Sequence, residues 1–273
     1  MSEPGAFSFG GRGIAEGYDD VMVPILFGPW AARLVAEHEG WAGATVLDLA
    51  SGTGVVAREL ADRVGPEGGV IASDLSGGML EVARRRCEGS VPPVRFVESP
   101  ANPLDLPDAS VDAVVCQQGF QFFPDRPAAA REVARVLRGG GRVLVSTWRP
   151  VNECELFGWI CDALHACDAP EVAALMRVPF DFLPASELRA IFEGVGFVDV
   201  EVDRRAHPMV STGGAEQALA IAYGSPIGPK LAALSEDRRV AFRRALVERV
   251  ERSTDGSTLG QMAANLLSAR KRA

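Results

Sequence analysis

Short apolar segments alternate with helical patterns along the first half of the chain. The segments of strand length lie at 44–50, 70–75, 94–99, 111–117 and 142–148. Residues 55–64, 77–87 and 128–137 separate them with apolar side chains spaced as on one face of a helix, and 138–141 is expected to cap and turn the last helix. Strands that alternate with helices are typical of βαβ units, so we predict an α/β fold around a parallel sheet.

The alternation stops after residue 150. Helices are expected at 152–168, 170–177, 186–194, 215–223 and 236–252. Strands are expected at 197–206 and 262–270, although the second contains helix-favouring Ala and Leu. We therefore predict a helical insert that covers the same sheet as a cap.

The composition and charge of the chain limit which molecules it is expected to bind. The 273 residues are 47% hydrophobic, and 28 basic residues stand against 36 acidic ones, a net charge of −8. No Lys/Arg run is longer than 84–86, so we do not expect nucleic acid as a partner. The first 18 residues lack the cationic start and apolar run of a signal peptide, and no stretch of 18 consecutive apolar residues occurs in the sequence. We therefore expect a soluble, cytoplasmic protein without a membrane span.

The five cysteines show no C-x-x-C pair. A disulfide framework or a metal site is therefore not expected, and we interpret the cysteines as reduced, mostly buried thiols. Cys154, Cys161 and Cys167 are spaced to fit the packing face of one helix.

A glycine loop follows the first predicted strand. It contains Gly52 and Gly54 within VLDLASGTGVVA, and Asp74 ends the second strand 20 residues later. Glycines at such a turn let a ligand approach the backbone, and the carboxylate can accept the two ribose hydroxyls of a nucleoside. The alternative is a tight turn with Asp74 as a helix cap. The loop alone does not separate a dinucleotide from another adenosine cofactor.

Four segments in order carry a resemblance to a known family. They are VLDLASGTG, SDLSGGML, DLPDASVDAVVCQQGFQFFPD and REVARVLRGGGRVLVSTW. The chain resembles the class I S-adenosylmethionine-dependent methyltransferases, especially those that act on quinones, sterols and secondary metabolites. The resemblance is strong over 44–150, weak over 197–206 and 262–270, and nearly absent in the predicted cap.

The resemblance implies a Rossmann-like sheet of seven strands whose last strand is antiparallel and lies beside 197–206. It also suggests a division of the chain into 1–43 as an N-terminal helical lid, 44–150 as the cofactor-binding core, 151–195 as a helical cap for substrate, and 196–273 as the completion of the sheet with a helical insert. S-adenosylmethionine would be the cofactor, and S-adenosylhomocysteine its product.

The resemblance also implies roles for particular residues. The implied cofactor contacts are Tyr18, Ala50, Ser51, Gly52, Gly54, Asp74, Leu75, Met79, Pro100, Ala101 and Gln117. Among these, Asp74 would hold the ribose, Leu75 and Met79 would pack on the adenine, and Tyr18 would belong to a lid. Met79 could equally be a core residue of its helix.

Two positions depart from the family pattern. Ala50 stands where the first glycine of D-x-G-x-G-x-G is usual, and Ser99-Pro100-Ala101 stands where many relatives have Gly-Asp-Ala. Pro100 offers neither a carboxylate nor an N–H group, so adenine recognition there would need the Ala101 N–H or another group.

A further set of residues is predicted to contact the molecule that accepts the methyl group. Gln118, Phe122 and Trp159 are candidate substrate contacts, and Gln121 and His165 are candidate catalytic residues. The alternatives are that the phenylalanines are core, the glutamines are solvated caps and His165 is a surface residue. The apolar cap favours a small hydrophobic acceptor, and a homodimer is left open.

Two other functions stay open. An NAD(P)-dependent oxidoreductase shares the glycine loop, but the chain has no Tyr-x-x-x-Lys pair and only Lys230 and Lys271 as lysines. A protein of this fold could also bind the cofactor without methyl transfer, as a cyclase or a binding module. Formation of S-adenosylhomocysteine separates these functions.

Overall fold

The computed structural model describes residues 12–180, 183–253 and 256–273. The described chain divides into two compact units. We call residues 27–147, 183–204 and 265–273 the α/β unit, and residues 12–26, 148–180, 205–253 and 256–264 the helical unit.

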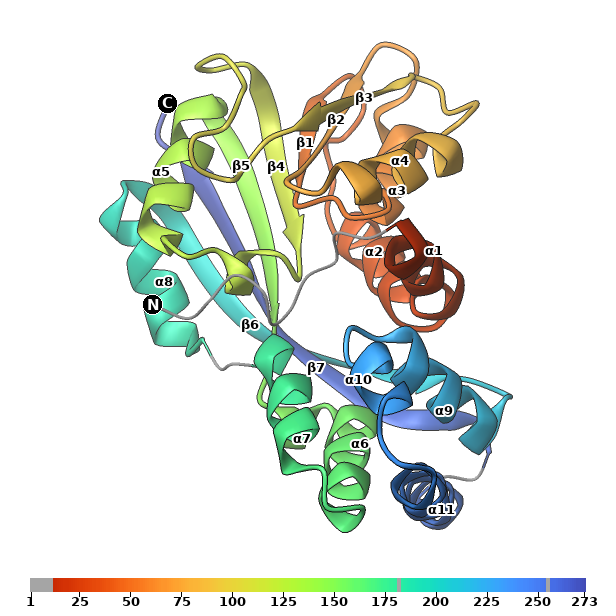
Figure 1. The fold of residues 1–273 in the computed structure, drawn as a ribbon. Helices are drawn as coiled ribbons and strands as arrows, with labels where there is room; N and C mark the ends of the chain where they lie inside the picture. Colours follow the sequence, from red (N-terminus) through yellow and green to blue (C-terminus); the bar gives the residue numbers. More distant parts are fainter. Residues whose placement is uncertain (1–11, 181–182, 254–255) are drawn as a thin grey trace. The chain divides into compact units, whose positions relative to one another are not determined.

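Seven strands form a single sheet in the order β3-β2-β1-β4-β5-β7-β6. The strands are β1 (Thr45–Leu49), β2 (Gly69–Asp74), β3 (Val94–Glu98), β4 (Val111–Gln117), β5 (Leu137–Trp148), β6 (Phe197–Val210) and β7 (Thr258–Lys271). Strands β1 to β5 pair in parallel, and β7 runs antiparallel between β5 and β6 (Figure 1). The predicted α/β fold and the place of the last strand are confirmed.

Three strands differ from the prediction by more than one residue at an end, and among them β7 begins at Thr258 rather than at 262. β5 begins at Leu137 and includes the predicted turn at 138–141, because Leu137 pairs with Val111 and Arg142 pairs with Ala113, so that the residues between them form a bulge. β6 continues to Val210, so His207 lies inside the strand. β7 is a strand despite its Ala and Leu, because most of its side chains are buried.

Helices connect the strands and make up most of the helical unit. The longer helices are α1 (Arg12–Val21), α2 (Gly28–Ala36), α3 (Val55–Val64), α4 (Gly77–Arg86), α5 (Arg126–Val136), α6 (Glu155–Ala166), α7 (Pro170–Arg177), α8 (Ala185–Gly194), α9 (Gly214–Gly224), α10 (Gly228–Ala232) and α11 (Glu236–Ser253). Short helical turns lie at η1 (Val23–Phe27), η2 (Phe120–Phe122), η3 (Val151–Glu153) and η4 (Val178–Phe180). The sequence pattern did not reveal α10, which is only five residues long.

The α/β unit has two apolar layers, one on each face of the sheet. On one face, Val46 of β1 packs with residues of α2 and α3, including Leu34 and Leu60. On the other face, Leu47 packs with α5 and α8, and Phe192 of α8 lies fully buried there. Neighbouring strand residues point to opposite faces, so a strand covered on both sides is apolar throughout. Figure 1 shows these helices on either side of the strands.

The helical unit has its own packing. α6 packs against α7 and α11, and α9 packs against α1 and α11. Cys161 is buried within α6, and Cys154 and Cys167 are buried at its two ends. All five cysteines are buried free thiols, as predicted, and burial raises the pKa of Cys116 to about 12.

Candidate functional site

The loop between β1 and α3 has an unusual backbone. Ala50, Gly52 and Gly54 have φ angles of 57°, 53° and 79°, in the left-handed region that favours glycine. Ala50 is the one with a side chain, and its methyl group faces Gly119 after β4. A Cβ at Gly119 would lie 2.5 Å from the Cβ of Ala50. Ala50, which replaces the usual first glycine of the loop, is thus accommodated by a glycine at position 119.

Asp74 holds this loop from the end of β2. One carboxylate oxygen accepts the N–H of Gly52 and the other accepts the N–H of Ser76, both at 2.8 Å. Burial raises the pKa of Asp74, whereas these N–H groups lower it by stabilising the charged form. The cap of α4 is the hydroxyl of Ser76, which accepts the N–H of Met79 at 3.3 Å. Asp74 therefore organises the glycine loop rather than capping α4.

The two predicted adenine contacts differ in exposure. Leu75, next to Asp74, has 72% of its surface exposed, although it is a large apolar residue. Met79 is only 3% exposed and packs inside the α/β unit. Leu75 is thus available to a ligand at the surface, whereas Met79 is packed as a core residue of its helix, and the adenine contacts of both stay predictions.

Asp48 was not singled out from the sequence. It lies fully buried in β1, and burial raises the pKa of its carboxyl to about 8, with the charge of Asp74 adding to the effect and the Ala57 N–H opposing it. One of its oxygens, Oδ2, has no partner in the part of the chain that is described. The available signal was its position as the first residue of the glycine-loop pattern.

The end of β4 carries two adjacent glutamines. Gln117 donates from Nε2 to the carbonyl of Phe27 at 3.1 Å. Gln118 has a φ of 57°, and neither atom of its side-chain amide has a hydrogen-bond partner among the described residues. Gln121, two residues into the segment that follows Gly119, is buried as well.

The phenylalanines after β4 face different surroundings. Phe120 lies in the core and contacts Phe123 and Phe192 with ring centroids 5.5 Å and 5.4 Å away. Phe122 is 39% exposed. Of Phe120 and Phe122, only Phe122 is therefore accessible at the surface.

Buried hydroxyl groups without partners gather at the same ends of the strands. Those without a hydrogen bond inside the described ranges are Ser51, Thr53, Ser73, Ser146 and Thr147. They lie in the loop after β1 and at the ends of β2 and β5, and Ser146 pairs with Gln117 in the sheet register. Buried polar groups are normally hydrogen-bonded, so such a gathering indicates a place where a polar ligand completes the bonding.

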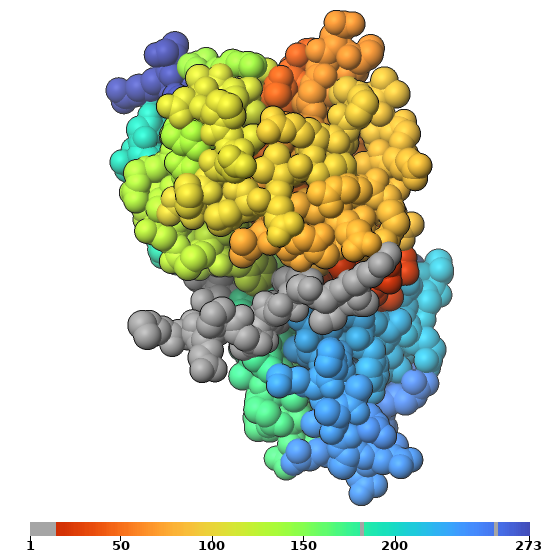
Figure 2. Space-filling view, turned by 45° about the horizontal axis from the view of Figure 1, so that its top comes forward, coloured from red at the N-terminus to blue at the C-terminus, as the bar shows by residue number. Residues whose placement is uncertain are grey.

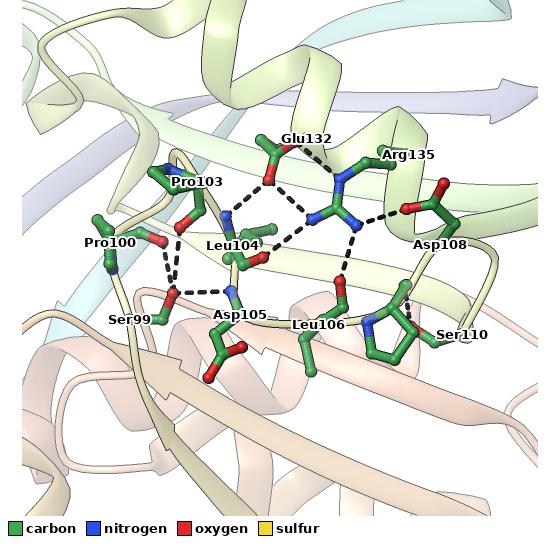
Figure 3. Close-up of polar contacts among 11 residues, drawn as sticks. Ser99, Pro100, Pro103, Leu104, Asp105, Leu106, Asp108, Ser110, Glu132 and Arg135 are labelled. Carbon is green, nitrogen blue, oxygen red and sulfur yellow. Dashed lines mark hydrogen bonds and ion pairs between the residues drawn. The ribbon is translucent and has the colours of Figure 1, made fainter.

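The loop after β3 is organised by Ser99. Its N–H donates to the carbonyl of Asp74 at 3.0 Å, and its hydroxyl accepts the N–H of Asp105 at 3.0 Å. The hydroxyl also lies within donating distance of the carbonyls of Pro100 and Pro103. Figure 3 shows the contacts of the Ser99 hydroxyl, and in Figure 2 the residues around position 100, in yellow, lie on the surface. Pro100 is exposed and Ala101 is half-buried.

Arg135 of α5 fixes the same loop further along (Figure 3). Its guanidinium donates to the carbonyls of Leu104 and Leu106 and to the carboxylates of Asp108 and Glu132. All five of its N–H groups are used, and lysine could not replace them. Glu132 also accepts the N–H of Leu104 at 2.6 Å, and its bond to Arg135 lowers the pKa of the Glu132 carboxyl.

Three predicted site residues lie in the helical unit. Tyr18 belongs to α1, and Trp159 and His165 belong to α6. The Trp159 ring is buried and lies 5.8 Å from the guanidinium of Arg249. His165 is exposed, and its Nδ1 lies 2.7 Å from the carbonyl of Cys161. The roles proposed for these three residues stay predictions.

The described residues contain neither a cluster of metal ligands nor a helix suited to a membrane. No three His, Cys, Asp or Glu side chains there are grouped as ligands of a metal ion. No helix in those ranges combines the length and the apolar character that crossing a membrane requires.

Comparison with known sequences identifies relatives. Residues 46–141 match a family described as a methyltransferase domain. The chain is 33% identical over 216 residues to the ubiquinone/menaquinone biosynthesis C-methyltransferase UbiE of Stenotrophomonas maltophilia, which covers 74% of this chain and 83% of the relative. It is 32% identical to the demethylmenaquinone methyltransferase of Deinococcus radiodurans, over 71% of this chain and 78% of that one.

Solved structures share the fold. The phosphoethanolamine N-methyltransferase 2 of Haemonchus contortus, in complex with S-adenosyl-L-methionine, matches with a TM-score of 0.60 and 18% identity over 96% of this chain and 58% of that one. A SAM-dependent methyltransferase of Aquifex aeolicus matches with a TM-score of 0.51 and 20% identity, over 73% and 93% of the two chains. The sequence relatives favour methyl transfer over the oxidoreductase alternative. The chain belongs to the class I S-adenosylmethionine-dependent methyltransferases.

Proposed function

We propose that this enzyme transfers the methyl group of S-adenosylmethionine to a ring carbon of a small, apolar hydroquinone. The relatives that match most of the chain are named as quinone-pathway methyltransferases, and one of them is named for transfer to carbon. A carbon acceptor in such a ring is made electron-rich by its ring oxygens, so it needs less help from a strong base than an alcohol does.

The residues of the α/β unit fit the cofactor. The observation that carries the proposal is the set of buried, unpaired polar side chains beside the glycine loop, at the ends of β1, β2, β4 and β5. Asp74 accepts two N–H groups at the C-terminal end of β2, which supports the proposal that its carboxylate also holds the ribose. Main-chain groups of 50–54 and Gln117 would then meet the amino-acid end, and Leu75, Met79, Pro100 and Ala101 the base.

The bound cofactor supplies a sulfonium methyl group that is already activated for transfer. The protein therefore has to align the acceptor carbon with that group and to exclude water. In the α/β unit, Phe122 offers an apolar surface, and Gln118 and Gln121 offer amides at the same segment. His165 and Trp159, on α6, and Tyr18, on α1, are the further candidates for these tasks.

Thermal unfolding with S-adenosylhomocysteine, S-adenosylmethionine and NAD tests the cofactor. A ligand at about 100 times its dissociation constant adds about 2.7 kcal/mol of stability, which corresponds to a rise of about 5 °C or more for a chain of this size. We expect the two sulfur compounds, and not NAD, to raise the midpoint.

Methyl transfer to 1,4-dihydroxynaphthalene then tests the acceptor class, with guanidinoacetate as a hydrophilic comparison. We expect S-adenosylhomocysteine and a C-methylated naphthalene as products. Methylation of hydrophilic acceptors alone would contradict the acceptor class. Cofactor binding without any S-adenosylhomocysteine formed would instead support the alternative of a cyclase or binding module.

Three expectations about context stay predictions. They are a cytoplasmic location, a homodimer, and the lack of a nucleic-acid partner. Sedimentation of the purified chain with and without S-adenosylhomocysteine measures the oligomeric state.

A further inference from the structure

Gln117 and Gln118 are neighbours at the end of β4, yet only the side-chain amide of Gln117 makes a hydrogen bond to the described residues. Gln117 donates from Nε2 to the carbonyl of Phe27, whereas its Oε1 has no partner in the described residues. Gln118 is only 5% exposed. Both the nitrogen and the oxygen of its side-chain amide are buried without a hydrogen-bond partner in the described residues. A buried amide that makes no hydrogen bond destabilises a fold, so its presence needs a reason.

The backbone of Gln118 is strained as well. Its φ of 57° lies in the left-handed region, which a residue with a side chain adopts at a cost in free energy. The conformation is held from both sides. The N–H of Gln118 donates to the carbonyl of Ser146 at 3.0 Å, and the next residue, Gly119, packs so closely on Ala50 that it has no room for a Cβ.

Two independent unfavourable features thus meet on one residue and are enforced by its neighbours. Strained backbone and unpaired polar groups are common at binding and catalytic sites, where a bound ligand supplies the hydrogen bonds that the protein itself does not. The strain also turns the chain into the segment that carries the exposed ring of Phe122. An amide that can both donate and accept, followed closely by an exposed aromatic ring, suits a flat ring compound that carries an oxygen.

We propose that the side-chain amide of Gln118 binds a ring oxygen of the methyl acceptor and makes the enzyme selective for acceptors that carry one. This inference rests on the proposed function. A hydroxyl group on the ring would donate to Oε1, and a carbonyl would accept from Nε2, so the same side chain serves either form of the ring. The cofactor keeps its own contacts at Asp74 and the glycine loop.

The test compares Gln118→Met with Gln117→Met. Both changes replace an amide by an apolar side chain of similar length at adjacent positions. We expect Gln118→Met to unfold at the same temperature as the unaltered protein or higher, because it removes an unpaired amide, and Gln117→Met to unfold lower, because it removes a hydrogen bond. We expect the dissociation constant of S-adenosylhomocysteine to stay within about twofold in Gln118→Met, which corresponds to less than one hydrogen bond.

The kinetics and affinity of the methyl acceptor test whether Gln118 binds it. In Gln118→Met we expect kcat/KM for 1,4-dihydroxynaphthalene to fall at least about tenfold, and the affinity of the S-adenosylhomocysteine-bound protein for the same compound to fall in parallel. Gln118→Asn, which keeps an amide on a shorter stem, should retain part of the affinity.

Three results would overturn the inference: a midpoint that falls as far as in Gln117→Met, a parallel loss of cofactor affinity, or an unchanged acceptor affinity. The proposed function fails differently, because then the unaltered protein itself would methylate no hydroquinone.

Discussion

The loops after β1 and β3 lie at the same end of the sheet but are built in contrasting ways. The loop after β3 uses its polar groups among themselves, with Ser99 and Arg135 bonded to its main chain at several points. The loop after β1 is held by Asp74, and its own Ser51 and Thr53 hydroxyls lack partners inside the described ranges. The contrast separates a loop whose polar groups bond mainly to one another from a loop that keeps unpaired polar groups, and we propose that the second loop binds the cofactor.

Removing the carboxylate that holds the loop after β1 should have the largest effect. Asp74→Ala loses two hydrogen bonds to N–H groups and the predicted ribose contact, so we expect the affinity for S-adenosylhomocysteine to fall at least about 100-fold. Titration calorimetry measures it. Asp74→Asn keeps an acceptor oxygen and should fall in between. An Asp74→Ala variant with unaltered affinity would contradict a role of Asp74 in cofactor binding.

Arg135→Lys tests the loop after β3. Lysine cannot reproduce the forked contacts to two carbonyls and two carboxylates, and we expect a loss of about 2 kcal/mol in the free energy of unfolding, reduced from the full sum because the side chain is partly exposed. Urea unfolding measures it. Arg85→Lys, in an exposed pair with Glu81, is the matched control and should change little. Equal effects of the two changes would contradict the special role of Arg135.

The buried carboxyl of Asp48 should give the protein a pH dependence. Because its pKa is raised to about 8 in the folded chain, the unfolded chain ionises first as the pH rises from about 4, and stability is lost up to about pH 8. Asp48→Asn resembles the protonated form. Its stability relative to the unaltered protein should therefore grow by up to about 1.4 kcal/mol between pH 6 and pH 7. A difference that does not change with pH would contradict a raised pKa.

The smallest effect concerns the backbone of the loop after β1. Ala50→Gly relieves a left-handed φ at a residue with a side chain, and we expect a gain of about 0.5–1 kcal/mol in the free energy of unfolding. Gly119→Ala is the opposing change, because its new Cβ would lie 2.5 Å from the Cβ of Ala50. Combining the two should recover part of the loss, which thermal unfolding of the double variant measures. Purely additive effects would show that these residues do not oppose each other.

The sequence was most informative where burial sets the pattern. β4 and α7 were predicted with their observed ends, because apolar spacing follows directly from the layers of the fold. β5 was predicted too short, since a run of three glycines indicates a turn equally well as a bulge. β7 was predicted as a strand from residue 262 although Ala and Leu favour a helix, and it begins earlier, at Thr258, where the neighbouring strands also bury its side chains.

The candidate site was predictable in its motifs and not in its energetics. Gly52, Gly54 and Asp74 were recognisable from their spacing. The sequence alone does not distinguish Gln117 from Gln118. The difference lies in the positive φ angle of Gln118 and in the bond of Gln117 to the carbonyl of Phe27, 90 residues away. Asp48 was overlooked because a single acid in a strand gives no hint of how deeply it is buried.

The path of the chain through the two units has a consequence for how such proteins can change. β6 runs from the α/β unit into the helical unit, and β7 runs back the other way, so each unit is made of separate stretches of sequence. No single insertion or deletion in the gene exchanges the helical unit for another. Replacing the helical unit would instead require changes in several separate stretches of sequence, with β6 and β7 retained because they belong to both units.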